Sequence, residues 1–415
     1  MKIAILGYGV EGKSAYDYFL KQDPASEIDL FDEKVVSDDV VKITTVKSFS
    51  EVDFSSYDLI VRSPSVQPDK ISVRPTHQNR LTSVTQIFFD NCPAPIIGVT
   101  GTKGKGTTAS FIYEILTVNL PNKVHLLGNI GKPALDALPQ IQPNDVVVYE
   151  LSSFQLWDLT KSPHVAVITM FEPDHLEVHT DYQEYVGAKL NILRHQSADD
   201  FAIVNKNIDF GSFAVPAQTL FFPDDSLRSL AENRLVGEHN IANAEAAILA
   251  VRAFDPTITD SQIRLGLKSF YGLPHRLKFV AEKSGVKYYD DSIATTPGSA
   301  IAAVRSFTQP KILILGGSDK GADYHEIGEV AERSDVRQIF VIGANQAKVA
   351  AQVSEKFHGQ ITPLDSKNMA EIVKKIAASA RAGEVVIMSP AAASFDMFEN
   401  YQDRGRQFVE AVKAL

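Results

Sequence analysis

The sequence predicts an α/β protein whose sheets are mostly parallel and are divided among three domains. Short β-branched runs alternate with helical patterns along the whole chain, which is typical of strands joined by helical crossovers. Glycine-rich turns follow strands in three separate regions. In addition, 415 residues exceed what one ordinary hydrophobic core accommodates, so several domains are expected.

Local patterns indicate the strands and the domain boundaries. Prolines precede a new strand in DNCPAPIIG (90–98), and FYGLPHRLK (270–278) precedes a Gly-turn hairpin pattern. The resulting domains, each of ordinary size, are 1–92, 93–273 and 274–415. Strands are expected at 2–6, 27–31, 59–63, 95–100, 145–151, 164–170, 201–205, 311–317, 338–343 and 384–389.

Composition and charge exclude several classes of protein. The formal net charge of −10 argues against a protein that coats nucleic acid, because such proteins need basic faces. The single cysteine, Cys92, suits a reducing compartment. The apolar run before Gly7 is too short for a signal peptide, and no apolar stretch is long enough for a membrane span. We therefore expect a cytoplasmic protein without a membrane or nucleic-acid partner.

The first motif is GYGVEGKS, which follows the first expected strand. Gly7, Gly9 and Gly12 form a G-x-G-x-x-G pattern, and Asp32 lies twenty residues beyond Gly12. Such a loop presents the N–H groups of a helix N-terminus to a diphosphate. A UDP-sugar satisfies this requirement as well as a nicotinamide dinucleotide does, and a glycine turn without a ligand remains an alternative.

The second motif is GVTGTKGKGTTAS (98–110), which resembles a phosphate-binding loop with one departure. The usual pattern is G-x-x-x-x-G-K-[ST], in which the final hydroxyl contacts Mg²⁺. Here Lys105 is followed by Gly106, while Thr107 and Thr108 supply hydroxyls one and two places later. A strand before the loop and a helical pattern after it favour phosphate binding over a surface loop.

Polar residues near strand ends form two further groups. Glu150 ends one strand, His175 follows the next, and Lys189 lies in a helical pattern, so these residues suit a Mg²⁺ site beside the γ-phosphate. Each of the three taken alone is also compatible with a structural role. In the last domain, groups suited to a dicarboxylate or a nucleotide occur in four motifs, namely LPHRLK, YYDDSIATTP, LGGSDKGADY and SPAAASFDMFENYQDRG.

The motifs in this order resemble the Mur ligases, the ATP-dependent amide ligases of peptidoglycan synthesis. The resemblance rests on GVTGTKGKGTT, GNIG, ELSSFQL, EPDH, YVGAKLNIL, GEHNIANAEAA, GLPHR, DDSIATTP, GGSDKGADY and SPAAASFDMF. It implies a Rossmann-like UDP-sugar-binding domain, a central P-loop ATPase-type domain and a Rossmann-like C-terminal domain that binds an amino acid. It is closest to the branch that adds D-glutamate to the carboxylate of UDP-N-acetylmuramoyl-L-alanine, with release of ADP and phosphate. A monomer is expected.

The resemblance also implies roles for individual residues. Lys105 would hold the β- and γ-phosphates of ATP, and Thr107 with Glu150 would bind Mg²⁺. His175 would bind a second Mg²⁺, supported by an N6-carboxylated Lys189. Further implied ATP contacts are Gly101, Thr102, Lys103, Gly104, Gly106, Thr108, Asn129, Asn240, Arg276 and Asp291. Implied substrate contacts are Gly7, Gly9, Gly12, Ser63 and Pro64 for the UDP-sugar, and His275, Lys320, Ser394 and Phe395 in the last domain.

Three positions depart from the family pattern, and other functions remain alternatives. Gly106 replaces a hydroxyl residue, Ser65 replaces a glycine, and Ile293 stands where a lysine is frequent.

A dinucleotide-dependent oxidoreductase would leave the second phosphate loop without a use, and a P-loop switch would leave the first without one. The folyl-polyglutamate ligases usually begin near the phosphate loop, and a ligase for a diamino acid would be expected to carry a D-N-P-R-type motif, which is absent here.

Overall fold

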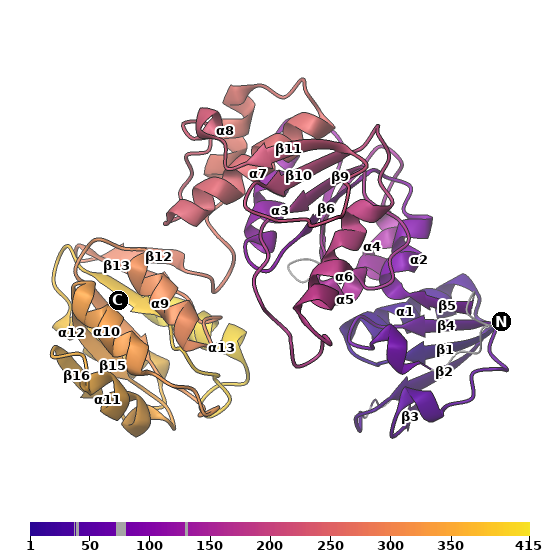
Figure 1. The fold of residues 1–415 in the computed structure, drawn as a ribbon. Helices are drawn as coiled ribbons and strands as arrows, with labels where there is room; N and C mark the ends of the chain where they lie inside the picture. The colour runs from indigo at the N-terminus through magenta and orange to yellow at the C-terminus, as the bar shows by residue number, and fades with distance from the viewer. Residues whose placement is uncertain (37, 39–40, 72–79, 129–131) are drawn as a thin grey trace. The chain divides into compact units, whose positions relative to one another are not determined.

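The computed structural model describes residues 1–36, 38, 41–71, 80–128 and 132–415 and contains three β-sheets (Figure 1). The chain forms two compact units. One comprises 1–233 and 239–270, and the other comprises 234–238 and 271–415. The first unit holds two of the sheets and the second unit holds the third. The predicted boundary after residue 92 falls within the first unit and stays a prediction.

The first sheet is wholly parallel and lies within the first predicted domain. In sheet order its strands are β3 (Ile43–Thr45), β2 (Glu27–Asp32), β1 (Lys2–Leu6), β4 (Leu59–Arg62) and β5 (Leu81–Ser83). The helices of this region are α1 (Val10–Gln22) and α2 (Val84–Asn91), with short 3₁₀ turns η1 (Phe49–Glu51) and η2 (Pro68–Lys70). The central strand β1 reads KIAIL and is buried over its last four residues, as expected for a strand covered on both faces.

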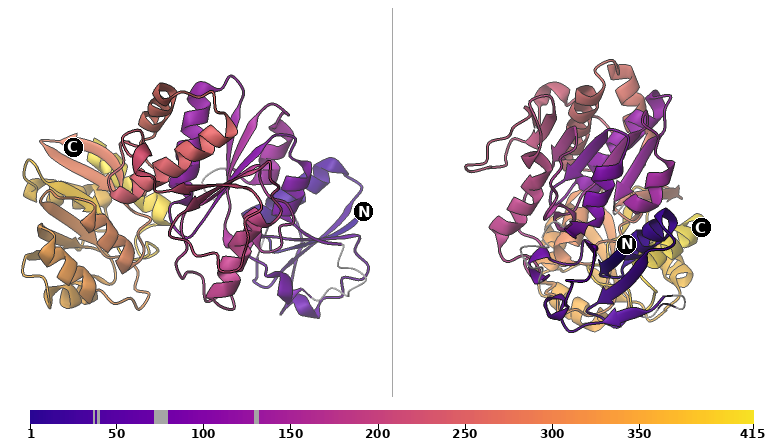
Figure 2. Two further views of the ribbon diagram at one scale, coloured as in Figure 1. Left: turned by 45° about the horizontal axis from the view of Figure 1, so that its top comes forward. Right: turned by 90° about the vertical axis from the view of Figure 1, so that its right-hand side faces the viewer.

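The second sheet is also parallel and lies between helices (Figure 2). Its strands in sheet order are β11 (Gln218–Phe222), β10 (Phe201–Asn205), β9 (Val165–Ile168), β6 (Ile96–Thr100), β8 (Val146–Glu150) and β7 (Val124–Gly128). The helices are α3 (Lys105–Asn119), α4 (Ala134–Ala137), α5 (Ser153–Leu156), α6 (Tyr182–Arg194), α7 (Glu238–Phe254) and α8 (Asp260–Ser269), with 3₁₀ turns η4 (Leu138–Gln140) and η5 (Asp225–Leu227).

The third sheet is mixed, because an antiparallel hairpin borders four parallel strands. Its strands in sheet order are β12 (Lys278–Lys283), β13 (Val286–Asp290), β17 (Val385–Met388), β14 (Lys311–Leu315), β15 (Val336–Val341) and β16 (Gln360–Pro363). Its helices are α9 (Pro297–Arg305), α10 (His325–Arg333), α11 (Gln346–Ser354), α12 (Met369–Ser379) and α13 (Tyr401–Lys413). The hairpin turns at Ser284 and Gly285, both at positive φ, which confirms the predicted Gly-turn hairpin.

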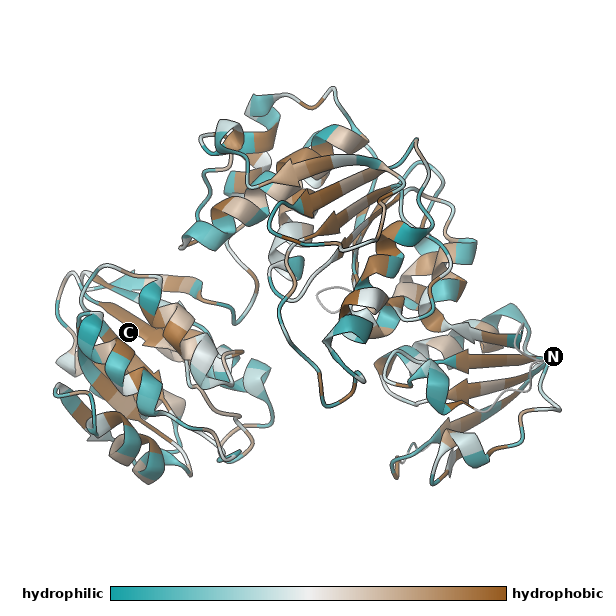
Figure 3. Cartoon of the chain, in the orientation of Figure 1, coloured by the Kyte–Doolittle hydropathy of each residue, from teal (hydrophilic) through white to brown (hydrophobic). Residues whose placement is uncertain are grey.

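The hydrophobic core follows the strands, which form the brown interior of each region in Figure 3. In the first unit one apolar cluster joins the first two sheets. Phe88 and Phe89 of α2 pack against the buried ring of Tyr149 on β8, with ring centroids 5.3 and 6.1 Å away. The third sheet has its own clusters on its two faces. Among the described helices, none combines the length and the apolar character that a bilayer crossing requires.

Candidate active site

The glycine loop between β1 and α1 is shaped by close backbone approaches. Gly7 has φ +82°, and a Cβ there would lie 2.2 Å from the Ser63 hydroxyl oxygen. A Cβ on Gly12 would lie 2.0 Å from the Gly7 carbonyl oxygen. Helix α1 begins just after Gly9, which makes no side-chain cap, so the first-turn N–H groups suit an anion. Asp32 accepts a 2.8 Å hydrogen bond from the Tyr8 N–H and thereby anchors this loop.

The second glycine-rich loop connects β6 to α3 and places Lys105 at the first residue of the helix. Gly104 caps the helix at φ +85°, and a Cβ there would lie 2.4 Å from Asn243 Oδ1. The Lys105 Nζ donates to the Thr102 carbonyl at 2.9 Å, so the side chain folds back over the loop. A cation at the start of a helix, beside backbone N–H groups, is the arrangement that a phosphate needs.

The other residues predicted for this loop differ in their exposure. Gly101 and Gly106 are buried, and so are Thr107 and Thr108. Among the described residues, Thr108 Oγ1 is a buried atom without a hydrogen-bond partner. Lys103 is exposed, and its Nζ forms a 2.6 Å ion pair with Glu172.

Lys189 lies in α6 and is buried beneath the phosphate loop. Its Nζ donates to the Gly101 carbonyl at 2.8 Å. Burial, reinforced by the positive charge of Lys105, holds the pKa of Lys189 well below its usual value, while Asp174 and Glu150 oppose this shift. These groups are therefore close enough to interact, and burial favours the neutral amine form of Lys189 relative to an exposed lysine.

Glu150 and His175 have different surroundings. Glu150 ends β8 and is 5% exposed. His175 lies in the loop after β9 at φ +55°, and its ring is partly exposed. Its Nδ1 is 3.5 Å from Glu177, and its Nε2 is 3.6 Å from Asp174. Among the described residues, no three His, Cys, Asp or Glu side chains gather closely enough to hold a metal ion by themselves.

One cavity of about 560 Å³ is lined by Gly9 of the first glycine-rich loop and by Lys105, which directly follows the second. Six residues predicted from the sequence line it, namely Gly9, Ser63, Pro64, Lys105, His175 and Lys189. The lining comes from the first and second sheets, and both belong to the first unit. The cavity thus brings Gly9, predicted to contact a diphosphate, together with Lys105, predicted to contact the phosphates of ATP.

Several lining residues were not predicted from the sequence, although each lies next to a motif that was. Glu11 occupies a variable position of the glycine loop, and Asp174 immediately precedes His175. The Tyr185 hydroxyl is 2.8 Å from Thr102 Oγ1, and burial raises the pKa of Tyr185 to about 12. Proximity to a motif was the available signal, but nothing in the sequence states which neighbours point into the cavity.

A buried hydrogen-bond chain supports the loop that carries His175. The His179 ring lies 2.9 Å from the Ser153 hydroxyl through Nε2 and 2.7 Å from Glu184 through Nδ1. The Phe154 ring stacks on His179 and also contacts His175, with a centroid distance of 5.0 Å to the latter. These hydrogen bonds hold the turn that precedes α6 in place. They were not predicted from the sequence.

Two predicted ATP contacts in the first unit remain to be placed. Asn240 is buried in α7, and its Oδ1 accepts from the Asn243 amide at 3.3 Å. Because Asn243 also lies against Gly104, α7 borders the phosphate loop. Asn129 lies outside the described residues.

In the second unit, Asp291 holds the turn that contains Arg276. Its carboxylate accepts hydrogen bonds from the Leu277 N–H at 3.0 Å and from the Ser389 hydroxyl at 2.6 Å. Burial raises the pKa of Asp291 to about 7, whereas these two hydrogen bonds act in the opposite direction. Asp291 is therefore tied into the fold of this turn.

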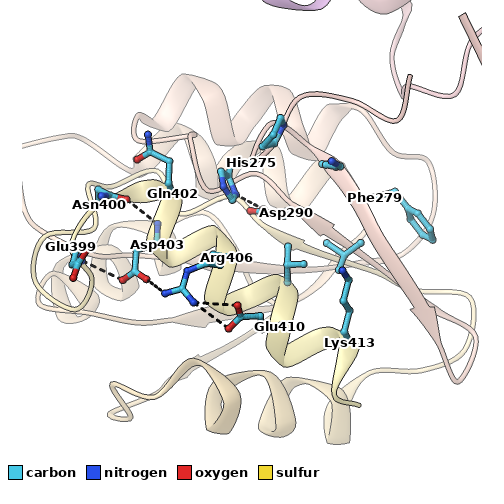
Figure 4. Close-up of a pocket in the computed structure, with 14 residues that line it drawn as sticks. His275, Phe279, Asp290, Glu399, Asn400, Gln402, Asp403, Arg406, Glu410 and Lys413 are labelled. Carbon is cyan, nitrogen blue, oxygen red and sulfur yellow. Dashed lines mark hydrogen bonds and ion pairs between the residues drawn. The ribbon is translucent and has the colours of Figure 1, made fainter. Parts of the chain in front are cut away.

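His275 lies at the edge of a second cavity, of about 750 Å³, between the hairpin and α13 (Figure 4). Its Nδ1 is 2.7 Å from Asp290, and its ring packs against Gly405. Arg406, which also lines this cavity, is paired with Asp403 and Glu410. Most of these polar groups form hydrogen bonds or ion pairs with one another. This cavity therefore lacks the group of charged side chains that converge on the first cavity.

The remaining predicted substrate contacts lie in two loops of the second unit. Lys320 Nζ is 5.9 Å from the centre of the Phe395 ring. Phe395 is 67% exposed, whereas its neighbour Ser394 is buried. Arg404 is fully buried and donates to the carbonyls of Ser292 and Ala392, so it has a structural role in joining two loops.

The chain is similar to known ligases over its full length. A family model described as the Mur ligase middle domain matches residues 99–218, and another, described as the Mur ligase, glutamate ligase domain, matches residues 275–392. A protein of Acetivibrio thermocellus named UDP-N-acetylmuramoylalanine–D-glutamate ligase is 34% identical, over 100% of this chain and 96% of that protein.

Two solved structures from Thermotoga maritima have a similar fold. UDP-N-acetylmuramate-alanine ligase superposes with a TM-score of 0.63 at 18% identity, covering 100% of this chain and 99% of that one. MurF ligase in complex with ADP superposes with a TM-score of 0.59 at 18% identity, covering 99% of this chain and 94% of that one. The predicted α/β class with mostly parallel sheets is therefore confirmed.

Proposed function

The chain belongs to the Mur ligase family, and on that premise we propose that it joins D-glutamate to UDP-N-acetylmuramoyl-L-alanine, converting ATP to ADP and phosphate. The observation that carries this proposal is the cavity shared by the two glycine-rich loops. A ligase of this kind must bring a sugar nucleotide and ATP together. A dehydrogenase needs only the first loop, and a nucleotide switch needs only the second.

In the proposed reaction the free carboxylate of the sugar nucleotide attacks the γ-phosphorus of ATP, and ADP leaves. The amine of D-glutamate then attacks the carbonyl of the resulting acyl phosphate, and phosphate leaves with formation of an amide. Lys105 and the first-turn N–H groups of α3 would stabilise negative charge as it moves between phosphate oxygens. The cavity walls would hold the carboxylate in line with the γ-phosphate.

The oxygen donors near the phosphate loop are of the kind that binds Mg²⁺ at nucleotide sites. Mg²⁺ is commonly held by one or two protein carboxylates together with substrate phosphates and water, so a complete protein cage is not required. Glu150 and the Thr107 hydroxyl would supply the protein ligands near the phosphate loop, and His175 would serve a second ion. When bound, Mg²⁺ would neutralise the charge of the transferred phosphoryl group.

Lys189 has the properties needed for N6-carboxylation. A buried amine with a lowered pKa is unprotonated more often than an ordinary lysine, and only the unprotonated amine adds to CO₂. Addition of CO₂ to the neutral amine forms a carbamate and releases one proton, which converts the side chain into an anionic oxygen ligand. We propose that the carbamate of Lys189 supports the metal near His175.

The amino acid is proposed to bind in the second unit, where Lys320 and Phe395 lie together. The Lys320 ammonium would pair with a carboxylate of D-glutamate, and the exposed Phe395 ring would cover its methylene groups. Ser394 follows the apolar strand β17 in the same loop and would contribute backbone groups. Arg276 would contact the nucleotide from its turn.

The test is phosphate release from Mg-ATP in the presence of UDP-N-acetylmuramoyl-L-alanine, with four amino acids supplied separately. D-glutamate should support release, with ADP as co-product, whereas L-glutamate, L-lysine and diaminopimelate should not. Release with L-glutamate alone would retain the chemistry and change the substrate. Absence of release with every amino acid, together with tight ATP binding, would overturn the proposed ligase.

A further inference from the structure

Glu11 introduces a carboxylate into a cavity that is proposed to bind a diphosphate. It lies in the first turn of α1, two residues after Gly9, and lines the same cavity as Ser63 and Lys105. Its Oε2 atom is shielded from solvent and has no hydrogen-bond partner among the described residues. A buried carboxylate oxygen without a partner is costly, and a nearby anion increases that cost.

The charged groups around Glu11 come from several elements. Asp136 of α4 acts on it electrostatically, and Asp136 Oδ1 itself accepts a 2.7 Å hydrogen bond from Ser14 of α1. Tyr149 of β8 is buried nearby and remains neutral, since burial raises its pKa. The other titratable groups that line the cavity are Lys105, Asp174, His175, Tyr185 and Lys189.

Burial, followed by repulsion from Asp136, raises the pKa of Glu11 to about 7. Near neutral pH the free protein is therefore a mixture of the ionised and protonated forms. A diphosphate at the N–H groups of the first turn of α1 adds negative charge beside this carboxyl group and shifts the mixture toward the protonated form.

We propose that the diphosphate of the sugar nucleotide binds together with one proton, which the Glu11 carboxyl group takes from solvent and holds while the substrate is bound. The inference rests on the proposed function, because it assigns the diphosphate to this cavity. Protonation changes the carboxylate into a neutral carboxyl group, which removes its repulsion with the diphosphate. The proton returns to solvent when the nucleotide leaves.

The test is isothermal titration calorimetry of UDP-N-acetylmuramoyl-L-alanine binding, without ATP, in buffers of different ionisation enthalpy. The diphosphate diester has no group that titrates between pH 6 and pH 9, so proton uptake reports on the protein. With a pKa of about 7, the wild type should take up about half a proton at pH 7 and close to one at pH 8. Its affinity should fall about tenfold between pH 6 and pH 8.

Three variants separate Glu11 from the other titratable groups. Glu11→Gln should bind with little proton uptake and a nearly flat pH profile. Asp136→Asn keeps an acceptor for Ser14 and lowers the pKa of Glu11, so it should take up more protons than wild type at pH 7. Glu51→Gln changes an exposed carboxylate in the same unit and should match the wild type.

The outcomes distinguish the inference from the function on which it rests. Equal proton uptake by wild type and Glu11→Gln would overturn the role of Glu11, as would wild-type binding without uptake. If Glu11→Gln fails to fold, judged by its melting temperature, the comparison of wild type with Asp136→Asn decides in its place. No binding by the wild type at any pH would overturn the assignment of the sugar nucleotide to this chain.

Discussion

At the scale of single residues, Lys189 combines burial, a 2.8 Å hydrogen bond to the Gly101 carbonyl and a lowered pKa in one side chain. If its carbamate supports the metal site, Lys189→Gln should lower kcat for phosphate release about 10–100-fold, the usual cost of losing a residue that supports a metal. Lys189→Arg should be equally impaired, because a guanidinium is not carboxylated. With ¹³C-labelled bicarbonate, the wild type should show a carbamate NMR signal that both variants lack.

A matched control distinguishes this role from a general effect of charge. Lys161 is a half-exposed lysine of the same unit that is paired with Asp90, and Lys161→Gln should leave both kcat and the carbamate signal unchanged. Full activity of Lys189→Gln would refute the proposed role. A lost carbamate signal with retained activity would separate the modification from catalysis.

Asp291 makes the stability of the second unit dependent on pH. In the unfolded chain its carboxyl group ionises near pH 3.8, whereas in the folded state it holds its proton up to about pH 7. The unfolded state therefore binds fewer protons in this window, and stability falls as pH rises from about 4 to about 7. Asp291→Asn preserves the size and an acceptor for the Leu277 N–H but cannot ionise.

The expected result is a crossing of melting temperatures. Asp291→Asn should melt at or below the wild-type temperature at pH 4.5, and by pH 8 the difference in stability should have shifted in its favour by about 3 kcal/mol, which is several degrees. Circular dichroism melting across this pH range gives the melting temperatures of both proteins. Because other titratable groups affect both proteins alike, the difference between the two temperatures reports on Asp291. Parallel pH profiles for the two proteins would show that Asp291 does not retain its proton.

At the scale of elements, the loop between β1 and α1 allows the structural role of one glycine to be separated from the proposed binding role of another. Gly12→Ala places a methyl group 2.0 Å from the Gly7 carbonyl, so it should destabilise the protein by about 1–3 kcal/mol. Gly9→Ala meets no protein atom within 4 Å, but it adds a methyl group at the cavity. It should retain stability and weaken sugar-nucleotide binding about tenfold, the value of one hydrogen bond to a charged group.

Thermal melting and nucleotide titration of the two variants measure these effects independently. Gly187→Ala, in α6, serves as a control, because its methyl group also meets no neighbouring atom and it does not line the cavity. It should leave binding unchanged and stability equal or slightly raised, since alanine favours a helix over glycine. Equal melting temperatures for Gly12→Ala and wild type would contradict the packing argument.

The elements also show what the sequence could and could not predict. Buried central strands such as β1, β6 and β14 have continuous apolar runs and were located to within a residue or two. Strands β3, β11 and β16, which lie at sheet edges, escaped prediction because they are short or largely exposed and their sequences lack such a run. Strands β5 and β7 were also missed. The glycine loops were predictable from their glycine spacing, and at Gly7, Gly12 and Gly104 a Cβ would collide with a neighbouring atom, whereas at Gly9 it would not.

Side-chain orientation within the site was less predictable than the loops that carry it. Lys105, His175 and Lys189 were singled out from local motifs and given roles by resemblance, and the cavity brings them together. Glu11 lay in the same quoted motif as Gly9, yet its burial depends on α4, which is remote in sequence. Contacts of this kind depend on how elements pack, and a local pattern does not encode them.

At the scale of the whole molecule, the distribution of core clusters predicts how fragments fold. The clusters on the two faces of the third sheet consist of residues beyond 270, apart from one partly buried contact, Val236. The first sheet instead shares a cluster with the second, in which Phe88 and Phe89 cover Tyr149. A fragment 271–415 should therefore fold by itself, whereas a fragment 1–92 would expose two aromatic rings.

Each exposed phenylalanine costs about 1.5–3 kcal/mol, which is a large part of the stability of a small domain. Fragment 1–92 should therefore melt well below fragment 1–270 and bind a hydrophobic dye, while fragment 271–415 should unfold cooperatively with native near-UV dichroism. Dichroism melting of the three fragments tests this directly. A cooperative, dye-free fragment 1–92 would show that the shared cluster contributes little. An unfolded fragment 271–415 would show that the third sheet needs the rest of the chain, although its apolar clusters are built almost entirely from its own residues.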